Sequence, residues 1–111
     1  MALKGVDVIQ LTTSTQVSYT VPAGFATRYV SMIFLSRHSS AVRVTVHHIP
    51  TGGSAANNNM IIEHNSASEI AAGETREEGY SRVMNAGDSI EAKANVNTVL
   101  NMLFSCEEVA V

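Results

Sequence analysis

The sequence predicts an all-β protein, an antiparallel β-sandwich of jelly-roll type with eight to nine short strands. Apolar and polar residues alternate over 17–21, 42–46 and 90–94, which is the period of a strand with one buried face. Valine, isoleucine, threonine and tyrosine, which favour strands, are frequent in these stretches. No segment has convincing helical periodicity, and turn residues recur at short intervals, as in sandwiches and jelly rolls.

Nine segments carry strand patterns. We expect strands at 6–11, 16–21, 27–36, 41–49, 59–65, 67–71, 78–84, 88–95 and 98–110, the last of them with a break near Ser105. The stretch 51–59 begins Thr51-Gly52-Gly53 and has no periodicity, so it is predicted to be a surface loop. Because 111 residues contain neither a repeat nor a linker, residues 1–111 are expected to form one β-sandwich domain.

Two of these segments are apolar on both faces. Residues 29–35 read Tyr-Val-Ser-Met-Ile-Phe-Leu, and residues 99–104 read Val-Leu-Asn-Met-Leu-Phe. Both runs are short and bounded by polar residues, which favours central strands over buried helices. Their second face must then be covered, and a partner subunit is one way to cover it.

Three corners share one pattern, with glycine in the third of four positions. They are Pro22-Ala23-Gly24-Phe25, Ala71-Ala72-Gly73-Glu74 and Asn85-Ala86-Gly87-Asp88. A type II turn needs a positive φ at that position, which glycine adopts without strain. The pattern therefore predicts three tight turns between strands.

Composition excludes several classes of protein. Hydrophobic residues make up 45% of the chain, which excludes disorder, but charged residues make up only 15%, against about 25% in a typical soluble domain. A net charge of −3, with seven basic residues, disfavours nucleic-acid binding. No apolar run reaches the roughly 18 residues of a membrane span, and the first residues lack the apolar region of a signal peptide. We therefore expect synthesis in the cytoplasm and no membrane partner.

The histidines leave one metal site open. His47 and His48 are adjacent, so on a strand they point to opposite faces and do not share an ion. The His-x-His spacing of a cupin is missing. One set would make a cupin-like site if folding brought it together: His48, His64 and Glu63. The other interpretation, which we favour, is that the histidines are structural and that the chain holds no metal and no cofactor.

No arrangement of side chains points to an enzyme, so we expect no catalytic residues. The single cysteine, Cys106, excludes an intrachain disulfide, and its acidic neighbours Glu107 and Glu108 raise the pKa of a thiol, the wrong direction for a nucleophile. No Gly-x-Ser-x-Gly motif is present. The carboxylates of 74–78 follow a predicted corner and are expected on a solvated strand edge.

Two places on the chain are candidate contact surfaces. Phe25 and Tyr29 flank Arg28 and form either an exposed anchor for a partner or part of the core. The stretch 1–15 is either an extended arm that pairs with a neighbour or an ordinary first strand. Val8 and Leu11 supply its apolar contacts. We take these five residues as the candidate partner-binding set.

The order of corners and strands resembles a known group of proteins. Val21-Pro22-Ala23-Gly24 ends one strand, residues 41–46 run into a Gly-Gly loop, and Asn85-Ala86-Gly87-Asp88 opens the strand Ser-Ile-Glu-Ala-Lys-Ala. Over residues 17–110 this resembles the small β-sandwich virion proteins of tailed bacteriophages. The chain departs from that pattern in Phe25 and Arg28 after the first corner. The resemblance implies a jelly-roll-like sandwich, oligomerisation and binding to another virion protein.

The expected function follows from this resemblance and from the absence of a reactive site. It is that of a non-enzymatic virion structural protein, a capsid decoration (cement) protein. Such a protein binds the outer capsid surface and stabilises the shell by bridging subunits of the major capsid protein, here as a homo-oligomer (dimer or trimer). One alternative is a neck, tail or fibre-associated virion protein, including one that attaches to the host; a second is a cupin-like metal-dependent enzyme.

Overall fold

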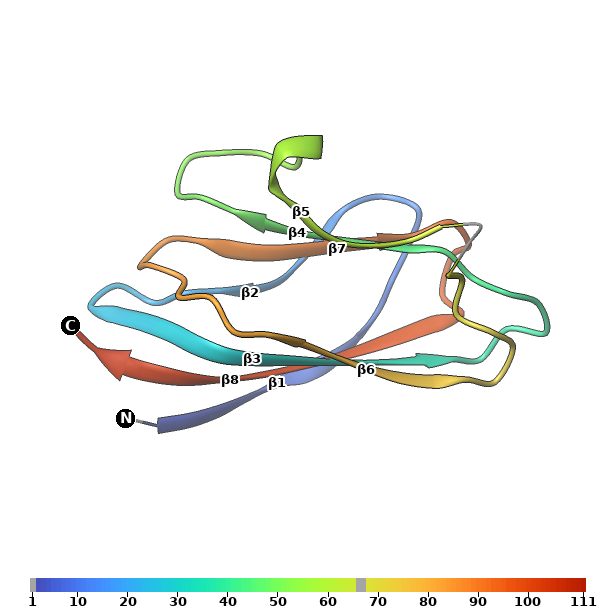
Figure 1. The fold of residues 1–111 in the computed structure, drawn as a ribbon, viewed down its shortest axis with the longest axis horizontal. Helices are drawn as coiled ribbons and strands as arrows, with labels where there is room; N and C mark the ends of the chain where they lie inside the picture. The colour runs from blue at the N-terminus through green and yellow to red at the C-terminus, as the bar shows by residue number, and fades with distance from the viewer. Residues whose placement is uncertain (1, 66–67) are drawn as a thin grey trace.

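The computed structural model describes residues 2–65 and 68–111, which form two four-stranded antiparallel sheets packed face to face (Figure 1). Sheet A has the order β1 (Ala2–Gln10), β8 (Leu100–Ala110), β3 (Phe25–Ser36), β6 (Thr75–Tyr80). Sheet B has the order β2 (Gln16–Thr20), β7 (Ser89–Ala94), β4 (Val44–Ile49), β5 (Met60–His64). A 3-10 turn, η1 (Asn57–Asn59), lies between β4 and β5. The predicted antiparallel β-sandwich is confirmed.

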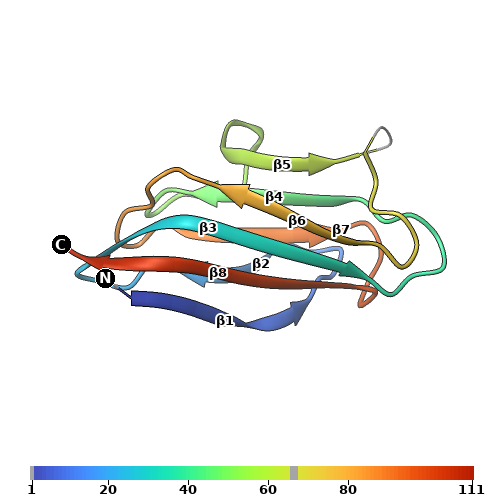
Figure 2. The ribbon, with the colours of Figure 1, turned by 60° about the horizontal axis from the view of Figure 1, so that its bottom comes forward.

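The pairing of strands is that of a jelly roll. Strands β4 and β5 form a hairpin, and around it lie the nested antiparallel pairs β3·β6, β2·β7 and β1·β8. Successive pairs fall alternately in sheet A and sheet B, as if one long hairpin had been rolled up. Figure 2 shows the result for sheet A, with β1 at one edge and β6 at the other. The two sheet edges β5 and β6 face each other across one open side of the sandwich.

The core lies between the sheets and is built from the inward positions of their strands. The two longest strands, β3 and β8, supply several of its largest fully buried side chains, among them Phe34, Met32, Phe104 and Met102. Tyr19 of sheet B stacks on Phe104 with ring centroids 4.8 Å apart. The two stretches that are apolar on both faces therefore occupy the centre of sheet A, as predicted.

The three predicted corners are tight turns. Each is closed by a backbone hydrogen bond from its fourth residue to its first, from Phe25 to Pro22, from Glu74 to Ala71 and from Asp88 to Asn85. Their glycines have φ values of +82°, +71° and +88°. The pattern of residues thus predicted both the position of these turns and their backbone conformation.

Several predicted strand boundaries are wrong. The strand expected at 78–84 runs from Thr75 to Tyr80, because its inward side chains include Arg76 and Glu78 and so break the apolar alternation. The strand expected at 67–71 falls partly on residue 67, outside the described residues; beyond it the chain forms only an isolated bridge, between Ile70 and Val42. The strand β8 is continuous, without the expected break at Ser105. Residues 2–10 pair with β8 of the same chain.

The described residues 2–65 and 68–111 contain no helix that is long and apolar enough to cross a membrane.

Candidate functional site

The outer faces of the two sheets differ in chemistry. On sheet B the outward positions of the central strands carry Thr45, Glu91 and Lys93, which lie close to one another in the register. The 51–59 loop covers His47 there, and the His47 Nδ1–H donates to the Ala56 carbonyl and to the side-chain oxygen of Asn59. This face is polar and partly covered by the chain itself, so it is an ordinary solvated surface.

Sheet A instead exposes apolar side chains. Five large apolar residues on its strands are exposed: Leu3, Val8, Tyr29, Leu35 and Leu103. Among the described residues, sheet B exposes one, Val17, and the other two lie outside the strands. Leu35 is 40% and Leu103 38% exposed although both lie on the two central strands of their sheet. An apolar face on central strands is typical of a contact surface.

A row of small residues crosses the outer face of sheet A from edge to edge. Gly79 of β6 pairs with Ser31 of β3, Ser31 with Ser105 of β8, and Ser105 with Gly5 of β1. A Cβ added at either glycine would meet no atom within 4 Å, so internal packing does not require glycine at these two positions. The row forms a shallow trough, bordered on one side by Ile33 and Leu103. We refer to the trough and these borders as the outer face of sheet A.

Tyr29 stands over the other border of the trough. Its backbone has φ +53°, a left-handed value that is unusual for tyrosine, and the register of β3 against β8 shifts between Arg28 and Ser31. The Arg28 guanidinium lies 5.1 Å from the Tyr29 ring and pairs with Glu107 at 2.9 Å. Two hollows of about 300 and 310 Å³ share Tyr29 as a lining residue. The outer face of sheet A is therefore uneven around this bulge, with a hollow on each of two sides that Tyr29 lines.

The structure separates the candidate partner-binding residues into three groups. Val8 and Tyr29 are exposed, at 54% and 62%, and are available for contact. Arg28 is held by Glu107, and Phe25 packs against the core. Leu11 is fully buried between the sheets, so its prediction as a contact residue is wrong: it follows β1 where the chain turns inward, and its N–H donates to the Leu100 carbonyl.

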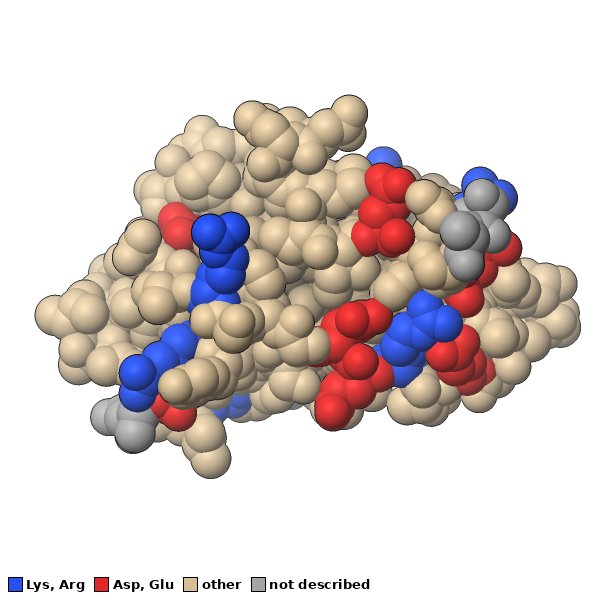
Figure 3. Space-filling model, viewed as in Figure 1, with Lys and Arg blue, Asp and Glu red and all other residues tan. Residues whose placement is uncertain are grey.

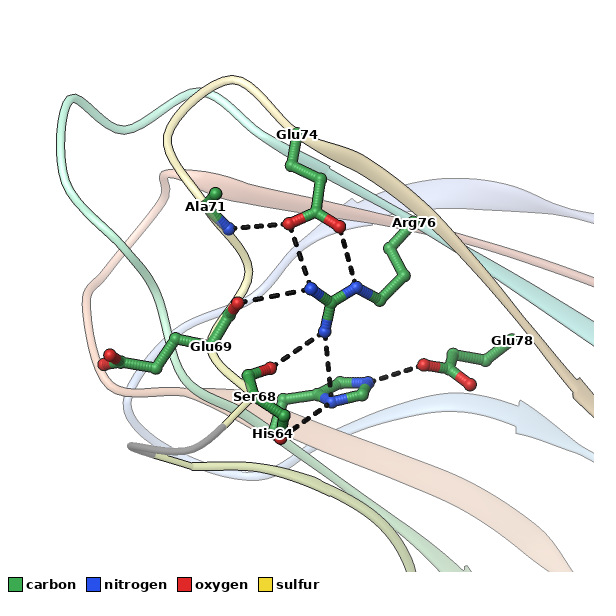
Figure 4. Close-up of polar contacts among 7 residues, drawn as sticks. All are labelled: His64, Ser68, Glu69, Ala71, Glu74, Arg76 and Glu78. Atoms are coloured by element: carbon green, nitrogen blue, oxygen red, sulfur yellow. Dashed lines mark hydrogen bonds and ion pairs between the residues drawn. The ribbon is translucent and has the colours of Figure 1, made fainter.

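The open side between β5 and β6 is closed by a polar seam. At one end, Arg76 forms two hydrogen bonds to Glu74 and others to the backbone carbonyls of Ser68 and Glu69 (Figure 4). Its guanidinium also lies 3.3 Å from His64 Nδ1. Because a guanidinium only donates, Nδ1 accepts, and His64 Nε2 donates to Glu78 at 2.7 Å. The Arg76 hydrogen bonds, with one from the Ala71 N–H, hold the pKa of Glu74 below its usual value.

At the other end of the seam, three side chains form a chain of hydrogen bonds. The Tyr80 hydroxyl lies 2.6 Å from His48 Nδ1, and His48 Nε2 lies 3.1 Å from Asp88. A carboxylate only accepts, so His48 donates to Asp88 and accepts from Tyr80. Burial raises the pKa of Tyr80, the wrong direction for a tyrosine nucleophile. The arrangement joins the two sheets rather than activating a side chain.

Charged side chains of both signs lie on this side of the molecule. Figure 3 shows it from the same direction as Figure 1, with acidic and basic side chains next to one another across the middle and right of the view. The salt bridge of Arg76 with Glu74 in the seam belongs to this side. Mixed charge of this kind is typical of a solvated surface.

The structure does not bring the predicted metal ligands together. His48 faces Asp88 and Tyr80, whereas His64, which pairs with Val44 at the other end of β4, faces Glu78. Glu63 is exposed on the other face of β5 and accepts from Asn65. The ligand set His48, His64 and Glu63 is therefore wrong. Within residues 2–65 and 68–111 no three His, Cys, Asp or Glu side chains are grouped so that they could hold a metal ion.

Cys106 is a buried core residue on the inward face of β8. Burial raises the pKa of its thiol, and the charge of Glu108 raises it further. Beside it the Tyr19 hydroxyl lies 2.9 Å from the Thr27 hydroxyl and donates to Glu108. Burial and the Glu108 hydrogen bond raise the pKa of Tyr19 as well. Both groups are protonated at neutral pH, which suits packing and hydrogen bonding.

Comparison with known proteins identifies solved structures with a similar fold. No protein-family model matches the sequence, and no curated protein does. Among solved structures, one similar chain comes from Bacillus endospore appendages described as a novel family of disulfide-linked pili; it has 10% identity and a TM-score of 0.58, over 99% of this chain and 88% of that one. A chain of infectious bursal disease virus, Gx strain, has 8% identity and a TM-score of 0.45, over 98% of this chain and 32% of that one. At 10% identity the similarity to the appendage protein shows the β-sandwich fold.

Proposed function

We propose that the chain is a non-enzymatic structural subunit of a virion, a capsid decoration protein. In this proposal it binds the outer surface of the capsid as a homo-oligomer and stabilises the shell by bridging subunits of the major capsid protein. Each copy contributes a modest contact, and repetition over the shell supplies avidity.

The observation that carries this proposal is the difference between the two outer faces. Sheet B presents charged and polar side chains, whereas sheet A, besides the Arg28–Glu107 pair and the exposed Glu77, presents five large apolar side chains around a trough of glycine and serine. A face of this kind buries apolar area when it meets another protein, and its small residues allow close approach of a second surface. The free edge of β1, with Leu3 89% exposed, extends the same surface.

The similarity in fold supports a role in assembly. The similar chain with TM-score 0.58 comes from endospore appendages that are described as disulfide-linked pili. The present chain has a single cysteine, which is buried, so its assembly is expected to depend on non-covalent contacts. Fold alone does not fix function, which is why the proposal rests on the outer face.

Binding to expanded, undecorated capsid shells tests the proposal. We expect the wild-type protein to co-sediment with shells and Leu103→Glu, which places a charge in the middle of the outer face of sheet A, to bind at least tenfold more weakly. Val17→Glu is the matched control, because Val17 is exposed on sheet B. Failure of the wild-type protein to bind any capsid site would contradict the decoration role and favour a neck, tail or fibre position. Equal binding by both variants would contradict the assigned face.

A further inference from the structure

A second surface feature lies away from the outer face of sheet A, beside the polar seam. It is a pocket of about 350 Å³ between the loop around η1 and the end of β6. Its lining includes His48, Asn58, Met60, Ile61, Tyr80 and Arg82. The volume lies at the lower end of the range for small-molecule sites, about 300 to 1,000 Å³.

The walls of the pocket are held in place by hydrogen bonds. His48 is fixed between Tyr80 and Asp88, and its ring meets the Tyr80 ring edge-on with centroids 5.6 Å apart. On the opposite wall, Asn59 accepts from the Ala56 N–H and donates to the Ser54 carbonyl. These three lining residues, His48, Tyr80 and Asn59, are therefore already ordered before a ligand binds, which lowers the entropy lost on their account.

One charge in this pocket lacks a partner. Arg82 is exposed and makes no hydrogen bond or ion pair within residues 2–65 and 68–111, and no acidic side chain lines the pocket. The nearby carboxylate of Asp88 accepts instead from His48, Thr51 and Asn85. The guanidinium is therefore available to a carboxylate or another anion, with which it forms charge-assisted hydrogen bonds.

The rest of the lining selects among anions. Asn58 is exposed and offers an amide that both donates and accepts, while Met60, Ile61 and the Tyr80 ring supply apolar contact. A phosphate or sulfate ion would leave these apolar groups without contact. A ligand with one negative charge, several hydroxyls and a C–H face would use all three kinds of group.

We infer that this pocket binds an acidic sugar of monosaccharide size. The sugar carboxylate pairs with Arg82, its hydroxyls with Asn58, and its C–H face with Met60 and Tyr80. The inference goes beyond the proposed function and does not depend on it, because Arg82, Asn58 and Met60 line neither of the hollows beside Tyr29, and of the residues that hold the sugar only Tyr80 also lines one of them.

Titration of the ¹⁵N-labelled protein, followed by NMR, tests the inference with four probes: methyl glucuronide, methyl glucoside, acetate and inorganic phosphate. We expect saturable shifts at the amides of 58–61 and 80–82 with the glucuronide, and binding of the other three that is about tenfold weaker or more. Arg82→Gln should weaken glucuronide binding about tenfold or more. Arg37→Gln, which alters an exposed arginine outside the pocket, should leave it unchanged.

Three results would overturn the inference. Equal affinity for the glucuronide and the glucoside would show that the carboxylate of the sugar does not contribute to binding. Equal affinity for acetate or phosphate at the same amides would show a general anion site and not a sugar site. Absence of saturable shifts with the glucuronide would exclude the site altogether. Binding to capsid shells by Arg82→Gln, measured separately, distinguishes any of these outcomes from failure of the decoration role.

Discussion

Asp88 accepts four hydrogen bonds at the end of the third glycine corner. They come from the Thr51 N–H and hydroxyl at 3.1 and 3.3 Å, from the Asn85 N–H at 3.0 Å and from His48 at 3.1 Å. Burial raises the pKa of this carboxyl, but the hydrogen bonds from His48 and the two backbone N–H groups outweigh it, so the pKa is lowered overall. One residue thus links the corner, the 51–59 loop and the seam.

Replacing Asp88 with Asn should lower the free energy of unfolding by about 1 to 3 kcal/mol at pH 7. Because the folded pKa lies below the unfolded value of about 3.9, the contribution of Asp88 is fully present above the unfolded value and is lost as the pH falls through the folded one. The variant should therefore lose less stability than the wild type on acidification. Urea unfolding at pH 7 and below pH 4 measures both effects. An equal loss in Glu77→Gln, an exposed control, would contradict the role of Asp88.

Two glycines with similar backbone conformation should tolerate alanine differently. Gly24 has φ +82° and open space where an alanine Cβ would lie, whereas at Gly87, with φ +88°, the Cβ would lie 2.5 Å from Thr51 Oγ1 and 2.9 Å from Thr51 Cγ2. Gly24→Ala should cost about 1 to 2 kcal/mol for the left-handed backbone. Gly87→Ala should cost about 1 to 3 kcal/mol more because of the clash with Thr51. Equal midpoints of thermal unfolding for the two variants would show that the contact with Thr51 is unimportant.

For individual residues, the sequence predicted local backbone geometry but not the pairing of side chains that are distant along the chain. The positive φ of Gly24, Gly73 and Gly87 follows from short-range turn chemistry. The link from His48 to Asp88 joins residues 40 positions apart and depends on how the strands align. The positive φ of Tyr29 was not predicted, because nothing in its residue type favours that conformation.

The strand β6 shows how a polar element is held in a sandwich. Its inward positions carry Arg76, Glu78 and Tyr80, opposite Phe34, Met32 and Val30 of β3. These side chains meet His64 and His48 from sheet B, so the edge of the sandwich is closed by hydrogen bonds where a central strand would use apolar packing. Strands β2, β4 and β7 were predicted within three residues because they alternate, whereas β6 was displaced because it does not.

Replacing Arg76 with Ala should lower the free energy of unfolding by about 1 to 3 kcal/mol, since it removes the hydrogen bonds of the guanidinium to Glu74 and to two backbone carbonyls. The amides of β5 and β6 should then exchange with solvent faster than those of β3 and β8. Arg43→Ala is the control, because its salt bridge with Glu69 is more exposed, and it should change stability by less than about 1 kcal/mol. Hydrogen exchange measured by mass spectrometry compares the two variants strand by strand. Uniform acceleration across the molecule would argue against a local seam.

The molecule as a whole has one polar outer face and one outer face, that of sheet A, on which the large exposed apolar side chains are concentrated. The sequence predicted that 29–35 and 99–104 form central strands with a second face to cover, and the structure confirms their place in sheet A. The sequence did not predict the trough. Its residues Gly5, Ser31, Gly79 and Ser105 are distant in sequence and become neighbours only through the register of four strands. Small residues carry no apolar pattern, so only the fold identifies them as one surface.

An exposed apolar face should make the protein self-associate at micromolar concentration. We expect the mass in solution to correspond to a dimer or trimer, and Leu103→Glu to shift it toward the monomer. Val17→Glu should leave the mass unchanged, since it alters sheet B. A stable monomer for the wild-type protein would weaken the predicted homo-oligomer and leave the outer face to a different partner.

Hydroxyl-radical footprinting of the particle-bound protein tests most directly whether the outer face of sheet A is the assembly surface. Leu3, Tyr29 and Leu103 should be oxidised in the free protein, diluted below the concentration at which it self-associates, and protected in particles, while Val17 and Val83 should react equally in both. Protection of Val17 with continued oxidation of Leu103 and Tyr29 would contradict the account, because the contact would then lie on the polar sheet.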